Sequence, residues 1–464
     1  MSEALPPGTA TSIVDSEGRA VGTVDVTLMA GSPALPNSGP DAATFLGILR
    51  RRDFLLLWLA QVTGQLADKF LMFTLLVVVF SLTGRSSTQS LVLLAYTLPS
   101  ILLSAAAGVY ADRHDKRTIM VGTSAARGVL VGVIPLMLAT PRLGSTAIPL
   151  VLATAVFSSV GQFFAPAEAA SIPHLVRRDQ IMLATSLFMT TVVGTLVAGV
   201  PLATLLIKVI GPDACFVVGA VLFLFASVCV LLIRTPLRAG PARPRATRSL
   251  TRELGEGLEL LSRRPELRLG LGQLVVALVV VMTMFVLGPA YAVHILERGP
   301  ADTYQLLLPS TAGIVVAAIA LGRGGRRLPR SRAVWTAALL SGTLLIGTGY
   351  LPGFLVHHRG GELLTPTVIV FSSLFGAAIG ALLIIAFTVV QEAADEQTRG
   401  RIFGAVFTAI NAAVAIPLLV AGQLADTIGV DRVCVLLGAF LVGWAIFCRT
   451  RLWASVRLLD GVAA

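Results

Sequence analysis

The chain has 464 residues, of which 55% are hydrophobic and only 13% are charged, and its mean hydropathy is +0.84. Soluble domains carry about 25% charged residues, so this composition excludes an ordinary soluble protein and indicates a polytopic membrane protein. The formal net charge of +11 would suit a nucleic-acid-binding protein, but the positions of the charges along the chain give it another meaning.

Apolar runs of membrane-spanning length recur along the chain. A transmembrane helix needs about 20 mainly apolar residues, and twelve runs satisfy this requirement. They predict an all-α polytopic protein with spans at 54–82, 88–111, 118–139, 146–166, 180–208, 213–234, 266–293, 304–322, 333–351, 366–391, 402–426 and 431–449.

The Lys and Arg residues fall mainly between alternate spans. With the N-terminus inside, 28 of the 36 Lys and Arg lie in cytoplasmic segments and six in outer loops, while Lys69 and Arg127 lie within spans. Such an excess in the inner segments is the positive-inside signal. It predicts a multi-pass protein of the plasma membrane with both termini in the cytoplasm and no nucleic-acid partner.

These assignments divide the chain into five parts. Residues 1–50 are rich in small residues and proline and are predicted to form a disordered cytoplasmic tail. The ranges 51–234 and 266–450 hold six spans each. Between them, 235–265 is a basic cytoplasmic linker with apolar residues at helical spacing, for which a helix on the membrane surface is expected. Residues 451–464 are predicted to be a second cytoplasmic tail.

The two six-span parts share an internal repeat. Cys215-Phe-Val-Val-Gly-Ala220 matches Cys434-Val-Leu-Leu-Gly-Ala439, and Pro201-Leu202 is matched by Pro417-Leu418. Because an even number of spans keeps both parts in the same orientation, the repeat predicts two parallel six-helix bundles related by an axis along the membrane normal.

The four cysteines are Cys215, Cys229, Cys434 and Cys448. None has the spacing of a metal or redox site, and we expect small buried side chains. No metal and no cofactor are predicted.

The loop after the second span carries the most specific motif, Gly108-Val-Tyr-Ala-Asp-Arg-His-Asp-Lys-Arg117. Together with twelve spans in two parallel halves, this loop resembles the signature of the major facilitator superfamily. Phe163-Phe-Ala-Pro-Ala-Glu-Ala-Ala-Ser-Ile-Pro173 is similar to the branch that contains bacterial drug and siderophore exporters. The resemblance covers about residues 50–450 and implies a secondary transporter.

Three departures from the family pattern bear on coupling. The family's glycine after the Asp-Arg pair is Asp115 here, and the arginine that many proton-coupled drug antiporters place in helix 4 falls at Phe157. The antiporter motif of helix 5 is reduced to Gly194, Gly199 and Pro201. The resemblance therefore implies proton antiport by kinship and not by motif.

The loop motif predicts a conformational latch at the cytoplasmic face. Gly108 permits close approach of another helix, and Asp112 is expected to dock at the N-terminus of the span that begins near Ile402, where the helix dipole favours an anion. Nearby cations would reach acids at the ends of spans 4 and 10. The predicted latch residues are Gly108, Asp112, Arg113, Lys116, Arg117, Glu168 and Glu392.

Such contacts would hold the inner ends of the halves together and stabilise an outward-open state. The alternative, an ordinary basic inner loop, explains Lys116 and Arg117 but not Gly108 and Asp112. Gly422-Gln-Leu-Ala-Asp426 has a similar spacing, but the topology places it at the outer face, so it cannot be the same inner device.

Span 1 carries a second constellation. Gln61, Gln65 and Asp68 share one helix face, with Lys69 adjacent. Asp68 lies about 21 Å along the span at 1.5 Å per residue, near the bilayer centre, where a charge usually faces a cavity or a partner. It is expected to titrate or to order substrate in a central cavity; the alternative is a packing pair with Lys69 or Arg127.

Further polar residues fall within spans. Each could line the cavity or form interhelical hydrogen bonds. These candidates are Arg127, Ser158, Gln162, Gln273, Thr408 and Asn411.

The leading functional prediction is a monomeric secondary active exporter of small amphipathic compounds, such as drugs, siderophores or metabolites, driven by the proton gradient. One alternative is a carrier of lysophospholipids or other anionic amphiphiles, because Gln65-Leu-Ala-Asp-Lys-Phe-Leu71 looks similar to a pattern of bacterial lysophospholipid transporters. A non-transporting receptor is a second. No enzyme is expected, since the five histidines fall in loops and no hydrolase or phosphate-binding motif occurs.

Overall fold

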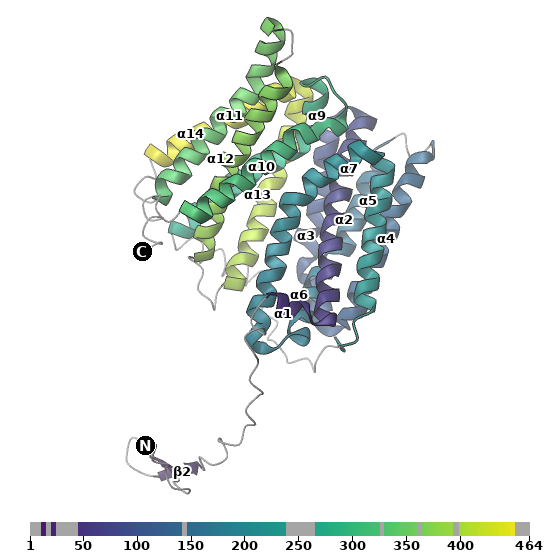
Figure 1. Ribbon diagram of the computed structural model, residues 1–464, viewed down its shortest axis with the longest axis vertical. Helices are drawn as coiled ribbons and strands as arrows, with labels where there is room; N and C mark the ends of the chain where they lie inside the picture. The colour runs from purple at the N-terminus through teal and green to yellow at the C-terminus, as the bar shows by residue number, and fades with distance from the viewer. Residues whose placement is uncertain are drawn as a thin grey trace.

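The computed structural model describes residues 11–14, 20–24, 45–141, 146–237, 265–324, 329–359, 363–392 and 399–450. Long α-helices dominate these ranges (Figure 1). The helices of the first half are α2 (Arg52–Thr83), α3 (Ser86–Arg113), α4 (Lys116–Ala139), α5 (Ile148–Gly161), α6 (Phe164–Leu175) and α7 (Ile181–Leu231), with a 3₁₀ turn η3 at Arg178–Gln180. Those of the second half are α9 (Pro265–His294), α10 (Tyr304–Gly324), α11 (Arg330–Arg359), α12 (Leu364–Glu392), α13 (Arg399–Ile428) and α14 (Val430–Thr450), with a 3₁₀ turn η4 at Pro300–Thr303.

The predicted all-α membrane class is confirmed. Ten helices of the described ranges are long and apolar enough to cross a bilayer. Two predicted spans share α7, which is interrupted at Gly211, where φ is +82° and glycine is favoured. The predicted span 146–166 corresponds to α5 and the start of α6. Twelve membrane crossings therefore stay a prediction.

The predicted disordered tail contains ordered segments. Strands β1 (Thr11–Val14) and β2 (Ala20–Val24) pair antiparallel. Helix α1 (Phe45–Leu49) packs against α2 and α7, and its Ile48 is fully buried. The strands pair through their backbones, and the disordered tail stays a prediction for the rest of 1–50. The predicted surface helix of the linker and the tail 451–464 lie outside the described residues.

The helix packing repeats between the halves. In the first half α2 packs on α7, α3 on α5, and α4 on α7; in the second, α9 packs on α13, α10 on α12, and α11 on α14. Gly313 of α10 and Gly376 of α12 allow the closest of these approaches, since a Cβ on Gly376 would overlap the Ser310 carbonyl oxygen and one on Gly313 the Ser373 carbonyl oxygen. The four cysteines are free and buried, as predicted.

The two halves meet at one end of the bundle. We call the end with Gly84 the outer end and the end with Asp112 the inner end, following the predicted topology. At the outer end, the Asp426 carboxylate of α13 accepts hydrogen bonds from the amides of Ser86 (2.6 Å) and Ser87 (3.0 Å) and from the Ser87 hydroxyl. The carboxylate of one half therefore caps the N-terminus of a helix of the other half.

Glycine makes this approach possible. A Cβ on Gly422, one turn before Asp426, would lie 2.9 Å from the Ser86 carbonyl oxygen. The Ser90 hydroxyl donates to the Leu418 carbonyl at 3.0 Å across the same interface. Thus α3 and α13 are in contact nearly backbone to backbone at their outer ends.

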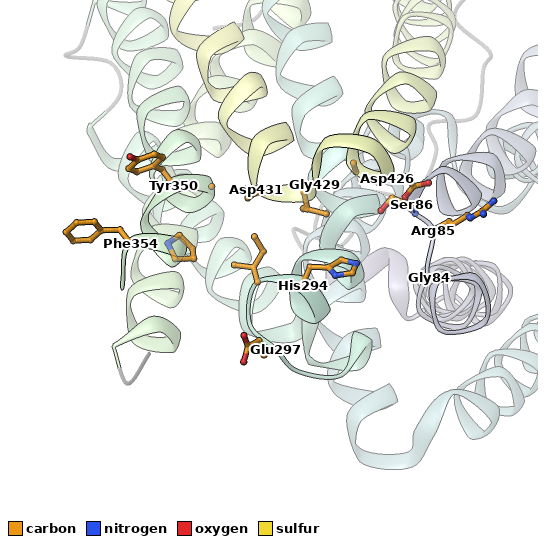
Figure 2. A pocket seen from close by; sticks show the side chains of 15 residues that line it. Gly84, Arg85, Ser86, His294, Glu297, Tyr350, Phe354, Asp426, Gly429 and Asp431 are labelled. Atoms are coloured by element: carbon orange, nitrogen blue, oxygen red, sulfur yellow. Dashed lines mark hydrogen bonds between the residues drawn. The ribbon is translucent and has the colours of Figure 1, made fainter. Parts of the chain in front are cut away.

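Further contacts join the two halves at the outer end. Lys208 pairs with Asp302 at 2.8 Å, and the Phe73 and Phe285 rings lie 5.6 Å apart. Figure 2 shows the surface pocket above this seam, of about 1090 Å³, in which Asp426 and Ser86 lie side by side. Between described residues, the hydrogen bonds and ion pairs that join the halves lie at this end.

Asp426→Ala should open the outer end. It removes three hydrogen bonds from the first turn of α3, two of them from backbone amides, and bonds to a charged group contribute about 1.5–3 kcal/mol each at most. We expect distances between spin labels at Arg85 and at exposed Tyr350, measured by pulsed electron resonance in a background without the native cysteines, to shift to a longer population. Gln423→Ala, an exposed change on the same helix, is the control, and an unchanged distribution for both variants would contradict the closing role.

Candidate functional site

A polar cavity of about 310 Å³ lies inside the first half, among α2, α3, α4, α5, α6 and the second part of α7. It brings together residues that are far apart in the sequence. The predicted site residues that line it are Gln61, Gln65, Asp68, Lys69, Arg127, Ser158, Gln162 and Glu168.

Asp68 is the centre of the polar network. The residue is buried, with 7% exposure, and its carboxylate accepts from Arg127 Nη2, from the Tyr96 hydroxyl and from Lys69 Nζ at 3.3 Å. Three donors from α2, α3 and α4 therefore converge on one carboxylate. Such pairing is what allows a charge to remain ionised among apolar helices.

Arg127 is held from both sides by aromatic rings. Its Cζ lies 4.1 Å from the ring centroid of Phe157 and 4.4 Å from that of Phe223. A Cβ on Gly161 would lie 3.2 Å from the same Cζ, so a larger residue there would press against the guanidinium. The cation–π contacts and the ion pair fix this side chain in the cavity wall. Phe157, where the family pattern places an arginine, thus supports an arginine of α4.

Other polar side chains complete the wall. The Ser158 hydroxyl donates to the Tyr96 carbonyl, and Gln162 Nε2 donates to the Ser158 carbonyl at 3.2 Å. Gln61 Nε2 donates to the Phe188 carbonyl at 3.3 Å, while its buried Oε1 accepts nothing from the described residues. Lys69 runs along α7 beside Gly199, where a Cβ would lie 3.0 Å from Lys69 Cγ.

Glu168 lies in the cavity and not at the latch. Its side chain is 8% exposed, and its buried Oε1 has no hydrogen-bond partner among the described residues. Gln162 and Phe163, between α5 and α6, keep right-handed helical backbone angles, so Glu168 follows Gly161 and Ala165 along the side that lines the cavity. The predicted pairing of Glu168 with Arg113 or Arg117 is absent from this conformation.

The latch residues of the loop between α3 and α4 make none of the predicted contacts with the second half among the described residues. Asp112 and Arg113 are exposed, and no described atom lies within 4 Å of a Cβ built on Gly108. Arg117 Nη2 donates to the Leu231 carbonyl, and the backbone amide of Lys116 to the Leu237 carbonyl at 3.3 Å.

Two further features belong to the latch region. Glu392 forms a two-point pair with Arg330 of α11, with Nη2 to Oε1 at 2.9 Å. Asp115, in place of the family glycine, is the N-cap of α4 and accepts from the Arg117 amide at 3.1 Å. The latch itself stays a prediction for another conformation.

Gln273 does not line the cavity. Its Oε1 accepts from Trp444 Nε1 at 3.0 Å and its Nε2 contacts Cys448 Sγ at 3.4 Å, so it joins α9 to α14 inside the second half. The amide is satisfied inside its own bundle, in agreement with the alternative of interhelical hydrogen bonding. Thr408 and Asn411 lie on α13, but their side chains are outside the described part of the structure.

The three residues left of the antiporter motif, Gly194, Gly199 and Pro201, lie on α7 and have different surroundings. Gly194 is exposed with no described atom near a built Cβ, whereas Gly199 makes room for Lys69. Pro201 is buried, and its carbonyl accepts from the Thr204 hydroxyl at 2.7 Å.

Sequence reasoning missed three residues of these sites. Tyr96 carries one of the hydroxyls of α3 but has no neighbouring charge in the sequence, and Phe223 reads as an ordinary apolar residue. Asp426 could have been found, since Gly422 and Asp426 repeat the glycine-to-acid spacing of Gly108 and Asp112. Among the described residues, no cluster of His, Cys, Asp and Glu could hold a metal ion.

Comparisons with known proteins agree with this architecture. The family model described as Major Facilitator Superfamily matches residues 57–417. Over 407 residues the chain is 23% identical to Macrolide efflux protein A of Streptococcus pyogenes, covering 85% of this chain and 95% of that protein. Over 387 residues it is 24% identical to Multidrug efflux pump Tap of Mycolicibacterium fortuitum, covering 82% and 91%.

A solved structure extends the likeness in fold. The crystal structure of a bacterial homologue of the iron transporter ferroportin in the inward-facing state superimposes with a TM-score of 0.63 at 15% identity, covering 87% of this chain and 99% of that one.

Asp68→Asn should destabilise the first half. The change leaves Arg127 and Lys69 buried without their carboxylate, and breaking a buried pair from one side costs about 3–5 kcal/mol. We expect a clearly lower midpoint of thermal unfolding in detergent, and partial recovery in Asp68→Asn/Arg127→Gln, which removes one charge of each sign.

The matched control is Asp179→Asn, which breaks the exposed pair with Arg177 at 3.3 Å and should cost at most about 1 kcal/mol. Equal midpoints for Asp68→Asn and the control would show that the network contributes nothing to stability.

Proposed function

The chain belongs to the major facilitator superfamily, and from this membership we propose that it exports small amphipathic molecules by proton-coupled antiport and alternating access. It would work in the plasma membrane with both termini in the cytoplasm, as a monomer and without a cofactor. The single observation that carries this proposal is the buried polar cavity around Asp68. Charged groups inside apolar spans are energetically costly, and they usually mark a substrate or ion pathway.

The conformation supports alternating access. The outer end is closed by Asp426 on the first turn of α3, while at the inner end the latch residues Asp112 and Arg113 are exposed. We infer an inward-open state, ready to take substrate from the cytoplasmic side. In the outward-open state, Asp112 would dock at the N-terminus of α13 and the contacts of Asp426 would break.

The relatives support export and indicate a substrate class. Two of them are named for the efflux of macrolides and of multiple drugs. The cavity combines aromatic surface, from Phe164 and Phe223, with charged and amide groups, a combination suited to amphipathic molecules.

One observation favours the second candidate, a carrier of anionic amphiphiles such as lysophospholipids. Two cations, Lys69 and Arg127, face the single carboxylate of Asp68, so this cluster has a surplus positive charge. A headgroup phosphate could pair with that surplus.

Flux across reconstituted vesicles tests both candidates. We expect macrolides or cationic dyes to cross wild-type vesicles faster when a pH gradient is imposed than when it is collapsed. Asp68→Asn should lose most of the gradient-driven flux, because the network that shapes the cavity is broken, while Asp179→Asn keeps it. Flux that ignores the gradient would refute antiport, transport of lysophospholipid alone would favour the second candidate, and no flux of any compound would refute transport.

A further inference from the structure

We propose that Glu168 is the exchange site of the cavity, where a proton and the cationic group of an amphipathic substrate replace one another. This inference rests on the proposed transport function and deepens it, because it names the exchanging residue and the substrate class. The substrate would be an amphipathic cation.

The first observation is that Glu168 is buried in the cavity without a protein partner. It is 8% exposed, lines the cavity from α6, and its Oε1 accepts no hydrogen bond from any described residue. An ionised carboxylate in such a place costs several kcal/mol unless a charge pairs with it. Glu168 must therefore hold either a proton or a cation.

The second observation is the contrast with Asp68. Asp68 already accepts from Lys69, Tyr96 and Arg127, so a proton on Asp68 would leave two cations unpaired. The two carboxyl groups of one cavity therefore differ in role. Asp68 is held as a structural anion, and Glu168 is free to change its occupant.

The groups that face Glu168 leave room for a cation. The elements packed against α6 are α2, α3, α4, α5 and α7. Of these, α2 contributes Asp68 and Lys69 to the cavity, α3 contributes Tyr96 and α4 contributes Arg127, whereas α5 and α7 contribute no titratable lining residue. The charged residues of 112–117, on α3 and α4, are outside the lining. Lys69 and Arg127 both pair with Asp68, and no hydrogen bond or ion pair between described residues joins either of them to Glu168.

The remaining lining defines what the rest of the ligand would touch. Gln61 Oε1 is a second buried acceptor without a partner, which suits the positive end of a dipole or cation. Phe164, Ala165 and Phe223 add apolar surface. A volume of about 310 Å³ is at the lower limit of small-molecule sites, so it would hold the cationic group and only part of a larger molecule.

The exchange predicts a linkage between protons and cations. Because the cation binds the deprotonated carboxylate, its affinity should rise with pH, and its binding should release a proton by the reciprocal relation. Tetraphenylphosphonium is a suitable probe, since it is amphipathic, permanently charged and carries no proton of its own.

The test measures proton release when tetraphenylphosphonium is added to the purified full-length protein in weakly buffered detergent with a pH-indicating dye. Wild type should release about one proton per cation bound at a pH where the carboxyl is protonated. Glu168→Gln should release none, and its weakened binding should no longer depend on pH. Glu168→Asp, which keeps the carboxyl, should retain release, and Asp179→Asn should behave as wild type.

Each other outcome overturns the inference. Release from Glu168→Gln equal to that of wild type would place the exchange elsewhere, and wild type that binds without release, or does not bind, would refute cation–proton exchange. The vesicle flux separates the two proposals. Gradient-driven flux that survives in Glu168→Gln leaves antiport standing without this site, whereas proton release at Glu168 without any flux leaves the site standing without transport.

Discussion

The ion pair between Asp68 and Arg127 is the interaction on which the first half of the molecule depends. In a low-dielectric interior the attraction between the two charges is strong, and so is the penalty for losing either one. The pair joins α2 to α4, the Tyr96 hydroxyl adds α3, and the rings of Phe157 and Phe223 hold the guanidinium from α5 and α7. Five helices are therefore joined by one polar network, and the residues of this network line the cavity.

This arrangement separates structural charge from exchangeable charge. A carboxylate with three donors, such as Asp68, gives the helices a fixed register. A carboxyl group with none, such as Glu168, lies in the same cavity and has no fixed state. In the proposed antiport cycle, Asp68 would keep the helices together while Glu168 changes its partner.

The sequence predicts the helices and half of the cavity well. Apolar runs locate the long helices but not α1, and Asp68 stands out because a charge in the middle of such a run requires a partner. The sequence predicts Glu168 at the latch because the residue lies at the end of a span, whereas in the structure it lines the cavity with Gly161 and Ala165. Gln273 was assigned to the cavity because an amide inside a span has the same appearance whether it faces a ligand or Trp444. Contacts between distant helices decide these cases.

The contact of Asp426 with the start of α3 has a mechanical consequence. Helix α3 has 28 residues, so its two ends are about 42 Å apart at 1.5 Å per residue. If the outer contact serves as a fulcrum, a tilt of only about 10° would carry the far end through about 7 Å, more than one helical pitch of 5.4 Å. The contact between α3 and α13 at the outer end is close because Gly422 has no side chain. A small tilt about this contact would therefore be enough to change the width of the opening at the inner end.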